Sequence, residues 1–458
     1  MKRIHPKQGP FVAVTVVMLA SASVSADYPV MSHRLLADPG SLVYNGRVYL
    51  YTSNDDDNTN HSYQMKSIVC VSSVDMKNWT DHGEVFRVPQ GASWATNSWA
   101  PAVIDRNGIF YLYFGNGAAG VGVATSASPT GPFSDALGHP LINSATPGAS
   151  GTSQWYFDPA VFIDDDGQAY LYFGGNKPSN ARVIKLNSDM ISVSGSAMAI
   201  AAPDFFEGSW MHKRNGVYYY SYVTQPASHI DYMTSTTSPM SGFTYRGVVL
   251  PNDGSINNWN NVHGAIFDFG GKSYIAHHNR YISNTIRIGP TNSKRNLALE
   301  ELNYNPDGTI QQVPWTTDGV TQLVAVNPFV RQEAEMFNRD SVIQTGGIET
   351  EPCGEGGMDV TAIANGDWIV VRGVDFGVGA SGFSARVASA AAGGNIELRL
   401  DSTAGAIIGA CTVTGTGGWQ TWTTATCAVV GAAGMHDLYL RFTGGSGSLF
   451  NVNWWLFN

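Results

Sequence analysis

Three carboxylates, Asp38, Asp158 and Glu207, occupy corresponding places in a repeated pattern of the sequence. Each stands just before a short apolar segment that we expect to form a strand, and each follows apolar or aromatic residues, where an uncompensated charge is costly. Carboxyls crowded into such surroundings acquire separated pKa values, so one stays ionised while another keeps its proton. Hydrolysis of a glycosidic bond needs this division, because one carboxyl protonates the leaving oxygen while another activates water or attacks the anomeric carbon. A single acidic residue in this position is usually a turn residue or a cap, but three favour a site.

The pattern that positions these carboxylates occurs five times. Each copy has a short apolar strand, a turn that ends in glycine and a strand rich in Tyr, Phe and Leu, with room for a four-stranded blade. The turn glycines supply the positive φ of tight hairpins; they are Gly46, Gly108, Gly167, Gly216 and Gly271. Five such units without helical periodicity predict an all-β fold that begins with a five-bladed β-propeller. The alternative is a β-sandwich.

In a propeller the innermost strands line a central channel, so residues at the start of each repeat should meet there. This places Trp99 and His263 beside the three carboxylates. We expect Trp99 and Phe157 to stack on sugar rings, whereas packing between strands is the simpler interpretation of Trp94, Trp155, Phe206 and Trp210. The acidic runs at 55–57 and 164–166 are interpreted as turns. Zinc chemistry is disfavoured, since the chain has no HExxH pattern.

Composition narrows the classes of function. The formal net charge is −10, which argues against binding to nucleic acid. Residues 1–26 have the basic, apolar and small-residue zones of an export signal, so we expect a secreted protein, extracellular or periplasmic, that does not span a membrane. We also expect a monomer. Cys411 and Cys427 lie in two strand-like runs and are the candidate disulfide, whereas Cys70 and Cys353 are expected to be unpaired.

Residues 27–327 resemble glycoside hydrolase family 43, whose members are five-bladed propellers that invert configuration. The segments HRLLADPGS, WYFDPAVFIDDDG and FFEGSWMHKRNG carry the likeness. The resemblance implies that Asp38 is the general base, that Asp158 orients the acid and tunes its pKa, and that Glu207 is the general acid. It also implies that His263 lies near an axial calcium ion or water cluster and that Arg280 reaches the substrate.

The opening segment and the run NSWAPAVIDRNGIFYLYFGNGAAGVGVA are similar to the bacterial arabinoxylan arabinofuranohydrolases of that family. The expected activity is therefore removal of α-L-arabinofuranosyl branches from arabinoxylan or a related plant cell-wall polysaccharide. The alternatives are a β-xylosidase, an arabinanase or a propeller that binds sugar without cutting it. Three axial carboxylates favour an enzyme over a lectin.

Residues 328–458 are rich in Gly and Ala with alternating Val, Leu and Thr, which predicts a β-sandwich of the jelly-roll type. This part resembles carbohydrate-binding module family 6. The likeness implies a structural calcium ion held with the help of Glu333 and Glu335, and a sugar cleft containing Trp419 and Asn451. Family members often carry a second aromatic residue in that cleft, where this chain has Ala362.

Overall fold

The computed structural model describes residues 29–58, 63–286, 293–341 and 347–458, so the predicted export signal lies outside the described residues. Regular structure is almost entirely β-strand. The described helices are short: α1 (Gly254–Asn257), α2 (Tyr281–Ile286) and the 3-10 turns η1 (Asp55–Asp57) and η2 (Pro178–Asn180). Among the described residues, no helix has the length and apolar character needed to cross a bilayer.

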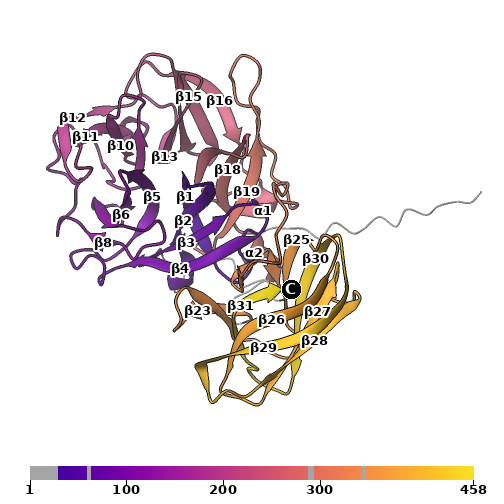
Figure 1. Cartoon of the computed structure of the whole chain (residues 1–458). Helices are drawn as coiled ribbons and strands as arrows, with labels where there is room; N and C mark the ends of the chain where they lie inside the picture. Colours follow the sequence, from indigo (N-terminus) through magenta and orange to yellow (C-terminus); the bar gives the residue numbers. More distant parts are fainter. Residues whose placement is uncertain (1–28, 59–62, 287–292, 342–346) are drawn as a thin grey trace, which may run out of the picture.

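The first two-thirds of the chain form five antiparallel sheets that follow one another in sequence (Figure 1). The first contains β1 (Leu36–Tyr44), β2 (Arg47–Asn54), β3 (Ser67–Ser73) and β4 (Trp79–Arg87). The second contains β5 (Trp99–Arg106), β6 (Ile109–Gly115), β7 (Val121–Ser126) and β8 (Ser134–Asp135). The third contains β9 (Ala160–Ile163), β10 (Ala169–Phe173), β11 (Arg182–Leu186) and β12 (Val193–Ala199). The fourth contains β13 (Phe205–Arg214), β14 (Val217–Thr224), β15 (Ile230–Ser235) and β16 (Thr244–Leu250). The fifth contains β17 (Gly264–Phe269), β18 (Lys272–Asn279) and β19 (Asn296–Leu302).

The five repeats match the five sheets, and each predicted glycine turn joins the first two strands of a sheet. All five glycines have φ between 72° and 81°, as in Gly46 (φ 72°) and Gly167 (φ 81°), a range that other residues adopt only at a cost. The prediction of four strands per repeat is wrong for the fifth sheet, which has three in the described residues.

The first strands of the sheets contact one another in a closed order. Strand β1 contacts β5, β5 contacts β9, β9 contacts β13, β13 contacts β17, and β17 contacts β1. Residues at corresponding positions of these five strands therefore face a common centre. The apolar core lies between successive sheets, as in the contact of Tyr172 on β10 with Tyr220 on β14, whose ring centroids are 5.8 Å apart.

The C-terminal part is a sandwich of two antiparallel sheets around one apolar core. One sheet has the order β22 (Arg339–Asp340), β25 (Trp368–Asp375), β30 (Met435–Gly444), β27 (Gly393–Leu400) and β28 (Ile407–Thr414). The other has β23 (Glu349–Pro352), β24 (Met358–Thr361), β31 (Asn451–Phe457), β26 (Ala380–Ser389) and β29 (Gly418–Ala432), with β20 (Gln332–Glu333) beside β31. The predicted disulfide between Cys411 and Cys427 is present and joins β28 to β29. Cys70 and Cys353 carry free thiols, as predicted.

The sandwich is joined to the first sheet by strand pairing. Strand β21 (Met336–Phe337) belongs to the C-terminal part in sequence, yet it pairs with β4 and becomes a fifth strand of the first sheet. Buried polar contacts surround this junction: the Asp81 carboxylate accepts hydrogen bonds from Arg34 Nε at 2.5 Å and from Thr350 Oγ1 at 2.6 Å. The two parts therefore share a continuous interface, which the sequence pattern does not reveal.

Candidate active site

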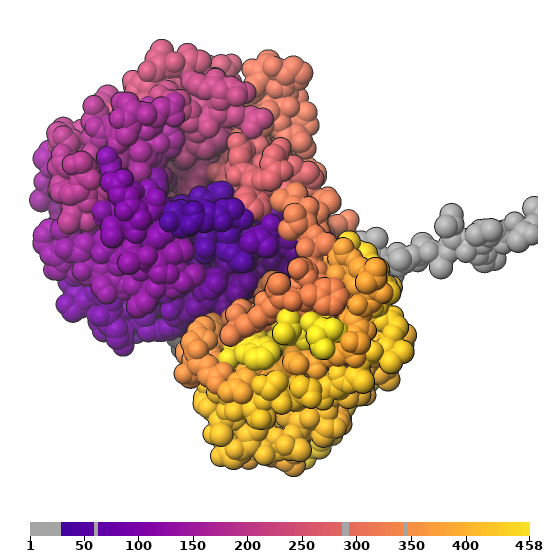
Figure 2. Space-filling view, viewed as in Figure 1, coloured from indigo at the N-terminus to yellow at the C-terminus, as the bar shows by residue number. Residues whose placement is uncertain are grey.

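A cavity of about 510 Å³ opens where the first strands of the five sheets meet. Figure 2 shows the surface hollowed near the middle of the five-sheet part. Asp38, Asp158 and Glu207 all line this cavity, so the structure brings together the three carboxylates selected from the sequence. The remaining lining residues include predicted Trp99, Phe157 and His263, together with Tyr63, Met65, Ala118, Trp155, Phe206, Gln225, Asn260, Asn261 and Arg295.

The backbone at the start of each repeat is irregular in a shared way. Asp38 (φ 51°), Ala100 (φ 43°), Asp158 (φ 48°) and Gly208 (φ 64°) all lie in the left-handed region. For residues other than glycine this conformation costs about 1 kcal/mol or more, and such strain is concentrated at functional sites. The left-handed residue is Asp38 in the first repeat and Asp158 in the third, so these two aspartates hold equivalent positions. In the second and fourth repeats the left-handed residue is Ala100 or Gly208, and Trp99 and Glu207 each lie one residue before it.

This register corrects the expectation that every site residue precedes its first strand. Asp158 and His263 do so, but Asp38, Trp99 and Glu207 lie within β1, β5 and β13, next to irregularities in the strand pairing. A bulge re-aims a side chain out of the strand's alternation. Apolar residues lie on both sides of these positions, so the sequence pattern did not show where β1, β5 and β13 begin.

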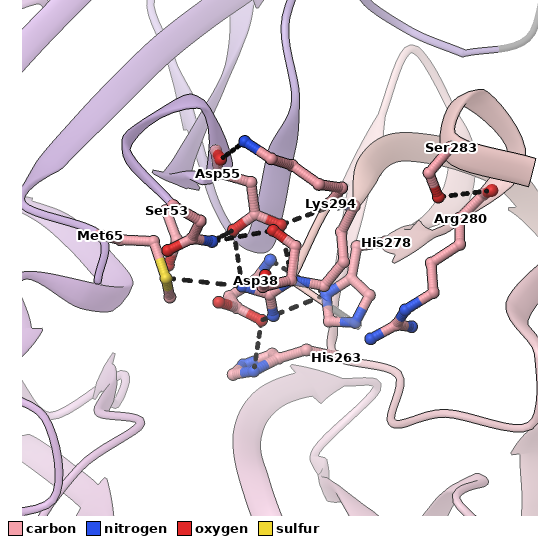
Figure 3. A network of polar contacts seen from close by, with 12 residues as sticks. Asp38, Ser53, Asp55, Met65, His263, His278, Arg280, Ser283 and Lys294 are labelled. Atoms are coloured by element: carbon pink, nitrogen blue, oxygen red, sulfur yellow. Dashed lines mark hydrogen bonds and ion pairs between the residues drawn. The ribbon is translucent and has the colours of Figure 1, made fainter. Parts of the chain in front are cut away.

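Asp38 is enclosed by basic side chains (Figure 3). Arg295 Nη1 donates to Asp38 Oδ1 at 2.5 Å. His263 Nδ1 lies 3.7 Å from the same oxygen, and Asp38 N donates to His278 Nδ1 at 3.1 Å. Burial by itself would raise the pKa of Asp38, but Arg295 and the two histidines outweigh it and hold that pKa well below its usual range. Asp38 is therefore ionised throughout the neutral and mildly acidic range.

His278 contacts Asp38 and Asn261 through its two ring nitrogens. Burial lowers the pKa of His278 to about 3, so the ring is neutral at pH 7. Its Nδ1 lies 3.1 Å from both the backbone nitrogen and Oδ1 of Asp38, and its Nε2 lies 3.2 Å from the carbonyl oxygen of Asn261. His278 thus connects the backbones of Asp38 and Asn261.

The other two carboxyls that line the cavity favour the protonated form. Burial raises the pKa of Glu207 to about 7, opposed by a hydrogen bond of 2.8 Å from Asn261 Nδ2 to Glu207 Oε1 and supported by the charge of Asp38. Burial, with the charges of Glu207 and Asp38, raises the pKa of Asp158 well above its usual range, although Gly208 N donates to Asp158 Oδ2 at 3.1 Å. The site therefore combines an ionised carboxylate with a neighbouring pair that retains a proton.

Arg280 is not among the residues that line the cavity, so its contact with the substrate stays a prediction. It is buried, at 1% exposure, and its Nη2 donates to Asn261 Oδ1 at 3.0 Å while Nη1 donates to Asn257 Oδ1 at 2.5 Å. Arg280 thus fixes the side chain that hydrogen-bonds Glu207. Arg295, which the sequence analysis missed, lines the cavity and also binds Asp55, with Nε 2.8 Å from Asp55 Oδ2.

The aromatic predictions divide into cavity and packing residues. Trp99 and Phe157 line the cavity as expected, and so do Trp155 and Phe206, which were interpreted as packing residues. The Trp155 ring lies edge-on to both Phe157 and Phe206, with centroids 5.4 and 5.7 Å away. Trp94 and Trp210 lie elsewhere: Trp94 stacks on Phe114, and Trp210 Nε1 donates to the carbonyl oxygen of Ile266.

Comparison with known proteins agrees with this geometry. The family model for glycosyl hydrolases family 43 matches residues 26–310, which contain every residue of the cavity. The chain belongs to glycosyl hydrolase family 43. It is thus a glycoside hydrolase, and residues 333–458 match the model for carbohydrate binding module family 6.

Family 43 relatives cover most of the chain. An arabinoxylan arabinofuranohydrolase from Bacillus subtilis is 44% identical over 94% of this chain and 92% of its own length. A crystal structure of a family 43 arabinoxylan arabinofuranohydrolase from that species, in complex with cellotetraose, matches with a TM-score of 0.89 and 43% identity over 94% of this chain and 97% of that chain. An α-L-arabinofuranosidase structure from Clostridium thermocellum, 51% identical, matches with a TM-score of 0.56, covering 64% of this chain and 99% of that one.

In the family 6 module, the predicted cleft residues lie together. Asn451 Nδ2 donates to the carbonyl oxygen of Trp419 at 3.2 Å and to Glu351 Oε1 at 2.8 Å, and Asn451 Oδ1 accepts from Thr361 Oγ1 at 3.0 Å. Trp419 is 38% exposed, so its ring is open to a ligand, whereas the polar atoms of Asn451 are engaged within the module. Ala362, in the left-handed region (φ 56°), provides no second aromatic face.

The two predicted calcium ligands of the module differ in their surroundings. Glu335 is buried at 3% exposure, and its Oε2 has no hydrogen-bond partner among the described residues; the same holds for Asn453 Oδ1. These unpartnered oxygens fit a hard cation such as calcium, which prefers oxygen ligands. Glu333 instead pairs with Arg331, Oε2 to Nη2 at 2.8 Å. No group of three or more His, Cys, Asp or Glu side chains suited to a metal occurs in the described part of the chain, so the ion predicted near His263 stays a prediction.

Proposed function

We propose that this enzyme is an inverting, exo-acting α-L-arabinofuranosidase that removes arabinofuranosyl branches from arabinoxylan. The observation that carries the proposal is that Asp38, paired with Arg295, and Glu207, whose pKa burial raises to about 7, line the same cavity. Relatives named arabinoxylan arabinofuranohydrolase, at 42–44% identity over 94% of the chain, support the choice of substrate.

In the proposed reaction, Asp38 accepts a proton from a water molecule as that water attacks the anomeric carbon. Glu207 donates its proton to the leaving oxygen of the xylose unit, and the glycosidic bond breaks. Asp158 lies near enough to Glu207 for its charge to influence that proton, in keeping with a role in tuning the acid. Trp99, Trp155, Phe157 and Phe206 provide apolar faces for the sugar.

The substrate assignment is tested on three polysaccharide or oligosaccharide substrates. We expect purified enzyme to release free arabinose from wheat arabinoxylan and to leave xylobiose and linear arabinan uncut. Release of xylose from xylobiose would instead indicate a β-xylosidase. Proton NMR at early times should show β-arabinofuranose first from an α-linked substrate; the α anomer first would contradict inversion.

The roles of the two carboxyls are tested by their leaving-group dependence. We expect Glu207→Gln to lower kcat on arabinoxylan by about 10² to 10⁴-fold, and to do less damage on an aryl arabinofuranoside with an activated leaving group, which needs little protonation. Asp38→Asn should lower both rates to a similar degree, since water activation is needed for either substrate. Equal losses in the Glu207 variant would contradict its assignment as the acid.

We further propose that the five sheets are the blades of a five-bladed propeller extending to about residue 327. The closed order of contacts among their first strands supports this arrangement. We propose that the protein is a secreted monomer whose predicted signal, residues 1–26, is removed; the Cys411–Cys427 disulfide supports an oxidising compartment.

We also propose that the module holds a structural calcium ion at Glu335 and Asn453, whose unpartnered buried oxygens support it. Adding calcium to chelator-treated protein should then raise its Tm. We expect sugar binding at Trp419 to be weak, because a single aromatic face is available.

A further inference from the structure

The loop between β16 and β17, residues 251–263, forms one wall of the cavity and carries an exposed tryptophan directly before two lining residues. Asn260 and Asn261 line the cavity, and Trp259 immediately precedes them. The Trp259 side chain is 72% exposed. An indole left this open to water forgoes the stabilisation that burial of such a large apolar surface provides, so its position needs an explanation.

The backbone that carries Trp259 is strained. Asn258 (φ 52°) and Trp259 (φ 56°) both lie in the left-handed region. Asparagine tolerates this conformation, but a bulky aromatic residue there is an outlier, and strain of this kind costs about 1–3 kcal/mol. A sequence with no use for an indole at this point would be more stable with glycine or asparagine.

The loop is held firmly enough to maintain that strain. Asn257 Nδ2 donates to the carbonyl oxygens of Asn260 and Asn261 at 2.8 and 3.1 Å. Asn258 Nδ2 donates to Asn284 Oδ1 on α2 at 2.7 Å. Arg280 Nη1, buried beneath the loop, donates to Asn257 Oδ1. Trp259 is therefore carried by a loop whose neighbouring residues are held by hydrogen bonds, next in sequence to Asn260 and Asn261 of the cavity.

Gly254 leaves the space that the indole occupies. A Cβ atom built on Gly254 would lie 1.9 Å from Trp259 Cε2, so the ring rests against the backbone of α1 where any side chain would displace it. With one side supported in this way, most of the remaining indole surface is open to solvent.

The low charge of the loop and its exposed indole favour an uncharged ligand with an apolar face. Residues 251–262 contain five asparagines, a single charged residue, Asp253, and no lysine or arginine. The amide nitrogens of all five asparagines donate hydrogen bonds within the protein, so the indole is the surface that this loop offers to a neutral ligand. The apolar face of a sugar ring stacks on indole.

We infer that Trp259 is a stacking platform for a xylose unit of the xylan main chain, outside the cavity that takes the arabinofuranosyl branch. This inference rests on the proposed function, because it assumes a branched polymer whose branch enters the cavity. The platform extends the binding surface from the cavity along the loop. It gives the enzyme a preference for polymeric over small substrates.

Two variants test the platform through different atoms. Trp259→Ala removes the indole, and Gly254→Ala displaces it while placing a good helix former in α1. The readout is the ratio of kcat/KM on arabinoxylan to kcat/KM on an aryl arabinofuranoside. We expect both variants to lower this ratio by about 3- to 10-fold, the range for loss of one aromatic contact. Trp259→Phe should recover most of the loss. Tyr245→Ala, which removes another exposed aromatic residue on β16, is the matched control and should keep the ratio.

A binding measurement separates this inference from the proposed function. In a Glu207→Gln background, calorimetry with unbranched xylotetraose should show weaker binding after Trp259→Ala. An unchanged ratio together with unchanged xylotetraose affinity would overturn the platform. An equal loss of kcat/KM on both substrates would also overturn it, because Trp259 would then act through Asn261. Wild-type enzyme that binds xylotetraose through Trp259 but releases no arabinose would refute the proposed function alone.

Discussion

The hydrogen bond from Asn261 to Glu207 opposes the effect of burial on the acid. Burial raises the pKa of Glu207 to about 7, and the Asn261 amide lowers it by stabilising the charged carboxylate. Glu207 acts in its protonated form, so activity should fall as the pH rises through that pKa. Asp38 stays ionised well below neutral pH and should not produce an acidic decline in the mildly acidic range.

We therefore predict that Asn261→Ala moves the alkaline limb of the kcat/KM profile to higher pH. Without the amide donor the charged form of Glu207 loses a stabilising contact, its pKa rises, and the protonated form persists further. Asn261→Asp should move the limb further in the same direction, because it adds a negative charge. Rate profiles from pH 4 to pH 10 check this; a shift to lower pH in either variant would contradict the assignment.

The sequence predicted the acidic residues of this site better than their partners. Asp38, Asp158 and Glu207 were found because each stands near the start of a repeat, although Glu207 lies one residue before the position of the two aspartates. Asn261 and Arg295 do not belong to the repeated pattern, since both lie in segments between strands. Only the folded structure shows that they line the cavity. Arg280 was assigned to the substrate, and its hydrogen bonds to Asn257 and Asn261 also make it a positioning residue.

At the scale of elements, hairpins were predictable and strand ends were not. Turn glycines identify hairpins because only a few residues tolerate their φ, a local property that sequence records directly. The bulges at Asp38 and Glu207 depend on neighbouring strands, so the apolar pattern continued past them. The pairing of β21 with β4 joins residues far apart in the chain, and two-residue strands leave no periodic pattern.

The Cys411–Cys427 disulfide links two strands, and its contribution to the stability of the module can be measured. It joins β28 at the edge of one sandwich sheet to β29 at the edge of the other, across 16 residues of sequence. Closing a loop of this length restricts the unfolded chain by about 3 kcal/mol. We predict that replacing Cys411 and Cys427 together with serine lowers the Tm of the module, measured by calorimetry. The Cys353→Ser variant, which removes a free thiol, is the control and should show a smaller change.

At the scale of the whole molecule, Asp81 joins the two parts. It is fully buried, it pairs with Arg34, and it accepts from Thr350 of the module. Removing one partner of a buried ion pair leaves the other charge uncompensated, at a cost of about 3–5 kcal/mol. We predict that Asp81→Ala lowers the Tm by several degrees.

The comparison for this prediction is Asp165→Ala. Asp165 is 86% exposed and pairs with Lys213 at 2.8 Å, and exposed pairs contribute about 0–1 kcal/mol. Thermal denaturation of both variants should therefore show a clear loss of stability for Asp81→Ala and little change for Asp165→Ala. Similar Tm values would mean that the contact between the two parts contributes little to folding.

The pairing of β21 with β4 also sets how the module lies relative to the cavity. A module on a flexible tether holds its enzyme near a surface at a raised local concentration and lets it sweep many orientations. Here the strand pairing removes the tether, so the module and the cavity keep one distance and one relative direction. A polysaccharide that occupies the module and the cavity at once must present its chains at that spacing, so we expect the enzyme to select for the arrangement of the polymer as well as for its chemistry.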